Sequence, residues 1–169
     1  MKCIVLACAS LLVLGRPDAA PAQACQPVPH AQLEALLPVL QGFSRGKPNG
    51  ETDNQEAVSR TTVDYEDRAG GAALISVELM DSCRNPDMLS EIREFLKTGP
   101  PPTRGTVFRS VPVGGFPAYE EWTAESQHTE IHVLVADRFM VKVTGDLVNL
   151  GAVQNAAQSI DVKKLAALR

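Results

Sequence analysis

The chain has 169 residues, of which 44% are hydrophobic and 21% charged, and its formal net charge is −4. This composition is typical of a globular protein with one hydrophobic core. Because the balance is mildly acidic and no basic cluster is present, it argues against nucleic acid and against an anionic membrane surface as partners.

Residues 1–24 have the order of a secretory signal peptide. A lysine precedes the apolar segment 3–14, and Ala22 and Ala24 form a small-residue cleavage motif. The apolar segment is too short to span a bilayer, and no later apolar run is long enough for a membrane helix. We therefore expect an exported protein, periplasmic or secreted, with a single domain at residues 25–169.

Cleavage after Ala24 leaves two of the four cysteines, Cys25 and Cys83. Two cysteines in an exported chain predict one disulfide. Closing a loop of roughly 59 residues contributes about 4 kcal/mol in the chain-entropy model. A reactive or metal-binding thiol pair is less favoured, since there is no C-x-x-C motif. Ala22 stands where a lipidated cysteine usually has a leucine, so release is favoured over a lipid anchor at Cys25.

The first part of the domain is expected to contain one short helix, a loop and a hairpin. An apolar stripe predicts the helix, which ends near Pro38, and the Gly- and Pro-containing stretch 42–54 predicts a loop. Alternating polar and apolar residues over 57–66 and 73–80 predict two paired strands. The stripe of the helix consists of Leu33, Leu36, Leu37 and Leu40.

The clearest predicted helix begins after Asn85. Asn85 can cap it, Pro86 suits the first helical position, and Gly99 followed by prolines ends it. Its buried stripe consists of Met88, Leu89, Ile92, Phe95 and Leu96. The next strand, 106–113, contains Pro112, whose missing N–H places the strand at a sheet edge or ends it there.

A strand entered from Gly114-Gly115 leads to a hairpin at residues 128–145 with a tight turn at Ala136-Asp137. The apolar face of this hairpin consists of Thr129, Ile131, Val133, Val135, Phe139, Val141 and Val143. Asp146 is expected to cap a final helix, and residues 160–168 to form a short amphipathic turn or helix. The order of elements predicts an α+β fold, a single twisted and mainly antiparallel sheet with helices packed on one face.

The C-terminal half resembles exported bacterial α+β domains of the PsbP-like kind. The resemblance depends on Val111-Pro-Val-Gly-Gly-Phe-Pro-Ala-Tyr119, on Asp137-Arg-Phe-Met-Val-Lys-Val143 and on a terminal helix. It implies a non-catalytic accessory or binding domain and transfers no site residues to this chain.

One polar triplet is the candidate site. His128, Glu130 and His132 alternate with the apolar residues of one strand and are therefore expected side by side on its opposite face. Two imidazoles and a carboxylate at this spacing suit Zn²⁺, Cu²⁺ or Ni²⁺, and no other cofactor is predicted. The competing interpretation is the solvated face of a half-buried strand, the more common reason for polar residues at every second position.

The sequence contains no catalytic motif: there is no G-x-S-x-G, no H-E-x-x-H and no cysteine placed beside a base. We interpret the acids Asp64, Glu78 and Asp81 as a solvated face. The aromatic residues Phe116, Tyr119 and Trp122 are expected in core or edge packing rather than in a ligand platform.

Three hypotheses for the function follow. The first is an exported binding or accessory protein, not an enzyme, that contacts another envelope protein or a small ligand. The second is a periplasmic protein that binds a transition metal at the polar triplet. The third is a hydrolase whose Ser–His–Asp site is assembled only by the fold.

Overall fold

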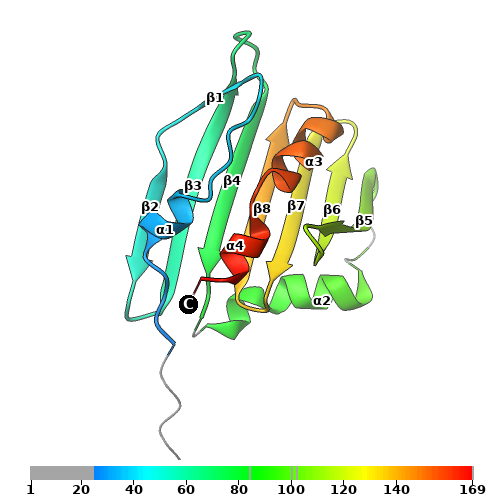
Figure 1. Cartoon of the computed structure of the whole chain (residues 1–169). Coiled ribbons are helices and arrows are strands. Elements are labelled where there is room, and N and C mark those ends of the chain that lie inside the picture. The colour runs from blue at the N-terminus through cyan, green and yellow to red at the C-terminus, as the bar shows by residue number, and fades with distance from the viewer. Residues whose placement is uncertain (1–24, 84, 100, 102, 169) are drawn as a thin grey trace, which may run out of the picture.

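Figure 1 shows the computed structural model of the chain, which describes residues 25–83, 85–99, 101 and 103–168. The strands are β1 (Phe43–Arg45), β2 (Asn49–Asp53), β3 (Val58–Asp67), β4 (Leu74–Asp81), β5 (Thr106–Val113), β6 (Phe116–Thr123), β7 (His128–Val135) and β8 (Phe139–Asp146). The helices are α1 (His30–Glu34), the 3₁₀ helix η1 (Pro86–Leu89), α2 (Ser90–Thr98), α3 (Leu150–Gln158) and α4 (Val162–Ala166). The expected signal peptide, residues 1–24, lies outside the described part of the chain.

The strands form one antiparallel sheet. Its order is β1-β3-β4-β8-β7-β6-β5, and β2 pairs with β3 on the same edge as β1. β4 and β8, which are distant in the sequence, are neighbours and join the two halves of the sheet. The α+β prediction with an antiparallel sheet is confirmed, and β5, which contains Pro112, is an edge strand as predicted.

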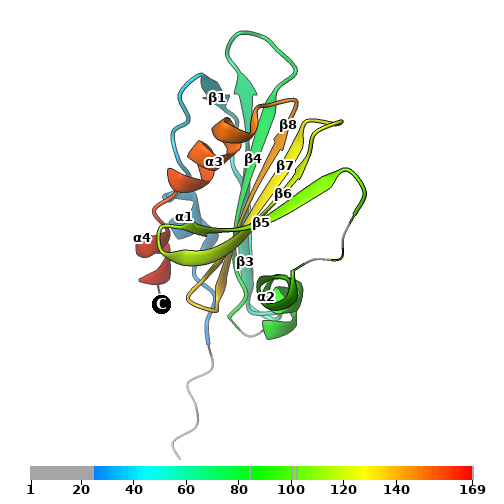
Figure 2. The same cartoon turned by 90° about the vertical axis from the view of Figure 1, so that its right-hand side faces the viewer.

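The two faces of the sheet are covered differently (Figure 2). α1, α3 and α4 lie on one face, over a core that includes Val77, Ile131, Val133 and Val141, each at most 1% exposed. α2 lies on the other face, where Ile92 packs with Met80 and Leu134 in a second cluster. The prediction that the helices pack on one face therefore fails for α2. The reason is that β4 and β7 carry Met80 and Leu134 at positions where the alternation alone would place polar residues.

The β7–β8 hairpin forms within the sheet as predicted. Val133 pairs directly with Val141, so that the apolar side chains of both strands share the helix-covered face. Ala136 and Asp137 have positive φ angles of 52° and 53°. A type I′ turn has two consecutive residues with positive φ at its centre. The turn at these residues therefore fixes the register of the two strands.

α3 packs closely on β8 because Gly145 has no side chain. A Cβ atom at this position would lie 2.3 Å from Val153 Cγ2 and 2.6 Å from Val148 Cγ1. Neither valine could keep its place against an alanine there. Gly145 therefore sets how near the helix layer comes to the sheet.

Some element ends and one loop differ from the predictions. Asn149 rather than Asp146 caps α3, because β8 continues through Asp146 before the chain turns. Asn85 makes no side-chain cap hydrogen bond, and η1 precedes α2. The predicted loop 42–54 contains β1 and β2, since both pair with the edge of β3.

The leucine-rich segment near the N-terminus is buried, although its helix is shorter than predicted. α1 ends at Glu34, and Leu33 is its one buried residue. Leu36, Leu37 and Leu40 follow outside the helix and are between 6% and 7% exposed. The Tyr65 hydroxyl donates a hydrogen bond of 2.6 Å to the carbonyl of Pro38, which holds this non-helical segment on the core.

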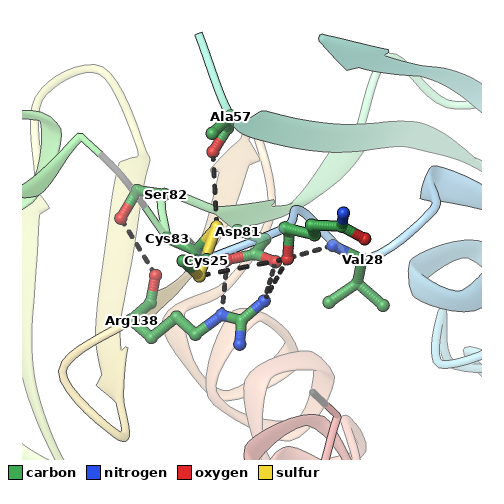
Figure 3. The surroundings of a disulfide bond; sticks show 8 residues. Cys25, Val28, Ala57, Asp81, Ser82, Cys83 and Arg138 are labelled. Atoms are coloured by element: carbon green, nitrogen blue, oxygen red, sulfur yellow. Dashed lines mark hydrogen bonds and ion pairs between the residues drawn. A yellow bond between two sulfur atoms is a disulfide. The ribbon is translucent and has the colours of Figure 1, made fainter. Parts of the chain in front are cut away.

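A disulfide and a buried ion pair fasten the N-terminal segment to the domain (Figure 3). Cys25 and Cys83 are bonded, with Cα atoms 5.7 Å apart, as the cysteine count predicts. The fully buried Asp81 carboxylate accepts two hydrogen bonds from the Arg138 guanidinium, at 2.8 and 2.6 Å. It accepts a third, of 2.9 Å, from the backbone N–H of Val28. The prediction that Asp81 belongs to a solvated face is therefore wrong, because its carboxylate is fully buried and pairs with the partly exposed Arg138.

We expect Asp81→Asn to lower the free energy of unfolding by about 3 kcal/mol, because the substitution leaves the Arg138 charge without its partner. The matched control is Asp137→Asn, since Asp137 pairs with Arg93 but its side chain is 74% exposed. That change should cost less than about 1 kcal/mol, and asparagine tolerates the positive φ there. Urea unfolding measures both, and equal effects would contradict a structural role of the buried pair.

Candidate functional site

The candidate residues lie on the sheet face opposite to α1, α3 and α4. The register of β3, β4, β8, β7 and β6 aligns the side chains of this face in rows. The first row is Thr62, Glu78, Lys142, His132 and Tyr119; the second is Asp64, Ser76, Thr144, Glu130 and Glu121; the third is Glu66, Leu74, Asp146, His128 and Thr123. We call these residues the open face, because among the described elements only η1 and α2 lie on this side, at one end of the strands, where they bury Tyr119 (Figure 2).

Glu130 lies between the two histidines of its strand. Its Oε2 is 2.9 Å from His132 Nε2, and its Oε1 is 3.3 Å from His128 Nε2. Two residues of β8 complete the cluster: Lys142 Nζ lies 3.0 Å from Glu130 Oε2, and an Asp146 oxygen lies 2.7 Å from His128 Nδ1. The structure thus brings together the three residues that the sequence singled out and adds two partners.

The register of the hairpin contains the signal that could have identified these two partners. The turn pairs His132 with Lys142 and His128 with Asp146, so each histidine has a charged residue directly opposite. Tyr119 comes from β6 and stacks on His132, with ring centroids 4.7 Å apart and planes 8° apart. Tyr119 follows from no local pattern, because the β6–β7 register depends on a turn of less distinctive sequence.

Hydrogen bonds shift the pKa values of this cluster. The bond to Asp146, together with Glu130 and against the effect of partial burial, raises the pKa of His128 above its usual 6.5. The bond to His132 lowers the pKa of Glu130 to about 2; burial opposes this shift and Lys142 supports it. Glu130 is therefore ionised at every physiological pH and serves as a fixed acceptor for its neighbours.

In the described arrangement the triplet is not a formed metal centre. Among residues 25–168 as described, no group of three or more His, Cys, Asp or Glu side chains is placed to hold a metal ion. The Lys142 ammonium and the imidazoles occupy the Glu130 oxygens that a cation would need. A metal ion bound between the imidazoles would have to displace the lysine.

No described histidine ring meets a nucleophilic serine. His30 Nδ1 is 3.2 Å from Thr52 Oγ1, which also accepts the backbone N–H of His30 at 2.9 Å. The rings of the other two histidines face carboxylates. The aromatic residues form no common platform either, because Phe116 and Trp122 alternate with Tyr119 along β6 and point to the opposite face.

A second buried carboxylate lies on the helix-covered face and has a structural explanation. Glu120 is 1% exposed, and its Oε1 accepts hydrogen bonds of 3.0 and 2.6 Å from the Arg109 guanidinium. Gln154 of α3 donates to Oε2 at 2.6 Å. Both oxygens are thus satisfied, and the group ties β5, β6 and α3 together.

No known protein family matches this chain, and neither a curated protein nor a solved structure is significantly similar to it. The resemblance to PsbP-like domains therefore stays a prediction. None of the helices in the described part of the chain is long and apolar enough to cross a membrane. The function is accordingly inferred from the geometry of the open face.

We expect His128 to titrate above 6.5 in the native protein and Asp146→Asn to lower its pKa, because the hydrogen bond to Asp146 is the largest cause of the shift. A pKa raised by folding stabilises the folded state below the unfolded pKa, and this contribution is lost as pH rises through the folded pKa. NMR titration of the imidazole protons measures the shift. Glu94→Gln on α2 should leave it unchanged, and a His128 pKa at or below 6.5 would contradict the described contacts.

Proposed function

We propose that this chain is an exported binding or accessory protein, without catalysis, that contacts another envelope protein through the open face. The observation that carries the proposal is the incomplete cover of this side of the sheet by the described elements (Figure 2). The sheet is a layer with two faces, and α1, α3 and α4 cover one face here, while most of the other has no helix over it. A partner would complete the second layer.

The open face is also organised in advance for binding. Glu130 is held by two histidines and Lys142, and Asp146 holds His128 from the other side. Side chains fixed in this way lose less conformational entropy when a partner binds than free surface side chains do. The fixed cluster supports recognition by contact.

Two features support export. The pattern of residues 1–24 is that of a signal peptide. The bond between Cys25 and Cys83 fits a protein that folds in an oxidising compartment. The described imidazoles face carboxylates or a threonine rather than a serine, so their contacts give no support to the alternative of a Ser–His–Asp hydrolase.

Site-specific photo-cross-linking in the native envelope tests the proposal. A benzophenone side chain is placed at Thr62 or at Thr144, both half-buried in the open face and both uncharged. We expect irradiation to produce the same cross-linked envelope protein from both positions, because both lie under the same partner.

The controls are benzophenone at Asn155 of α3 and at Lys163 of α4, which are exposed on the helix-covered side. They should not produce that product. Cross-links from the controls alone, or from none of the four positions, would overturn the proposed function.

A second candidate function is transition-metal binding at His128, Glu130 and His132. The observation that favours it is that the Nε2 atoms of both histidines face the same carboxylate, at 3.3 and 2.9 Å. Zn²⁺, Cu²⁺ and Ni²⁺ accept imidazole and carboxylate ligands in this combination. Asp146 would then orient His128 from behind through Nδ1, as outer carboxylates do at metal sites.

Calorimetric titration with the three ions distinguishes this candidate. We expect micromolar binding in the parent protein and its loss in the His128→Ala/His132→Ala double variant, because the imidazoles are the nitrogen ligands. His30→Ala is the control, since His30 lies with Thr52 on other elements. If no ion produces heat of binding, or if the double variant binds as the parent does, the metal hypothesis is wrong.

A further inference from the structure

We infer that the partner surface of the open face is a lysine- or arginine-rich segment of another protein. This inference rests on the proposed function and adds the chemistry of the partner. It is carried by the distribution of charge, which is far from uniform over the domain.

Most of the net charge lies on the open face. From Cys25 onward the sequence has nineteen Asp and Glu and fourteen Lys and Arg. Six of these acids are on the open face: Asp64, Glu66, Glu78, Glu121, Glu130 and Asp146. Lys142 is the one lysine or arginine in its rows, and Arg60 reaches Glu78 from the next row, at 2.9 Å. The remainder of the chain is therefore close to neutral.

Half of these carboxylates have no cation of their own. Among the described residues, no Lys, Arg or His forms an ion pair with Asp64, Glu66 or Glu121, whereas the other three acids have such partners. Asp64 accepts a hydrogen bond from the Ser76 hydroxyl, which leaves its charge uncompensated. Asp64 and Glu66 are exposed, so a partner can reach them.

Two of the acids oppose each other directly. Glu121 of β6 and Glu130 of β7 are cross-strand partners, and like charges at such a pair destabilise a sheet. Lys142 and the histidines compensate Glu130, but they leave Glu121 without a partner. A cation supplied from outside would relieve this repulsion, so the charge of the open face favours a partner of opposite sign.

The dimensions favour several cations on one segment over a single ion. Five strands at about 4.8 Å spacing make a surface about 19 Å across. The uncompensated carboxylates lie near both sides of it, Asp64 and Glu66 on β3 and Glu121 on β6. One ion cannot reach all of them, whereas lysine or arginine side chains along one segment can.

The test uses a short lysine-rich peptide as the probe, with a glutamate-rich peptide of equal length for comparison. Amide chemical shifts of the ¹⁵N-labelled mature protein report where each peptide binds, and fluorescence anisotropy gives the affinity. We expect shifts at open-face residues such as Thr62 and Thr144 with the lysine peptide only. Binding should weaken as salt rises, because exposed charges are screened.

The deciding variant is Asp64→Asn/Glu66→Gln/Glu121→Gln, which removes the uncompensated charges and leaves the Glu130 cluster intact. It should weaken binding of the lysine peptide about tenfold or more. The matched control is Glu34→Gln/Glu56→Gln/Asp161→Asn, which removes one acid of α1, one of the β2–β3 turn and one at the start of α4, all outside the open face, and should retain parent affinity. Circular dichroism establishes that both variants are folded.

Lysine-peptide shifts outside the open face, or equal losses in both triple variants, would overturn the inference. If cross-linking from Thr62 and Thr144 captures a partner whose binding the deciding variant does not weaken, the inference fails and the proposed function stands. If none of the four positions cross-links to a partner, both the proposed function and the inference fail.

Discussion

The side-chain alternation of the β7–β8 hairpin is the constraint on which the rest of the structure depends. Val133 and Val141 face the helix layer, so His132 and Lys142, one residue away on each strand, must face the other side. A slip of one residue would bury the charged cluster under α3 and expose the valines. The turn at Ala136-Asp137 and the close packing at Gly145 both resist such a slip.

The same constraint explains which predictions from sequence succeeded. Strands β3, β4, β7 and β8 follow from period-two patterns, and α2 from its apolar stripe and Gly99. β1 and β2 could not be predicted, because they are strands through pairing with β3 and have little apolar pattern of their own. The sequence could not show whether Asp146 ends a strand or caps the following helix, since an acid just before a turn suits both positions. The position of α2 on the opposite face was not predicted, because it depends on Met80 and Leu134, two apolar residues that break the alternation.

For the site, the sequence was sufficient to place three side chains together but not to determine their state. His128, Glu130 and His132 share a face by spacing alone. Whether these side chains bind a metal ion or form hydrogen bonds with one another depends on Lys142 and Asp146, which belong to the neighbouring strand. Spacing along one strand carries no information about the strand beside it, and this is why a metal site and a hydrogen-bonded cluster look alike in the sequence.

Two carboxylates of this protein show how position decides the role of a charge. Asp81 is fully buried. Its carboxylate accepts hydrogen bonds from Arg138 and from the Val28 N–H, so its charge is compensated within the fold. Glu121 lies opposite another glutamate at the surface and has no described cation partner. A fold needs the first kind of charge in order to assemble, whereas the second kind reduces its stability and is relieved only by something outside the domain. This contrast between the two carboxylates is what supports the proposal that a cationic partner binds the open face.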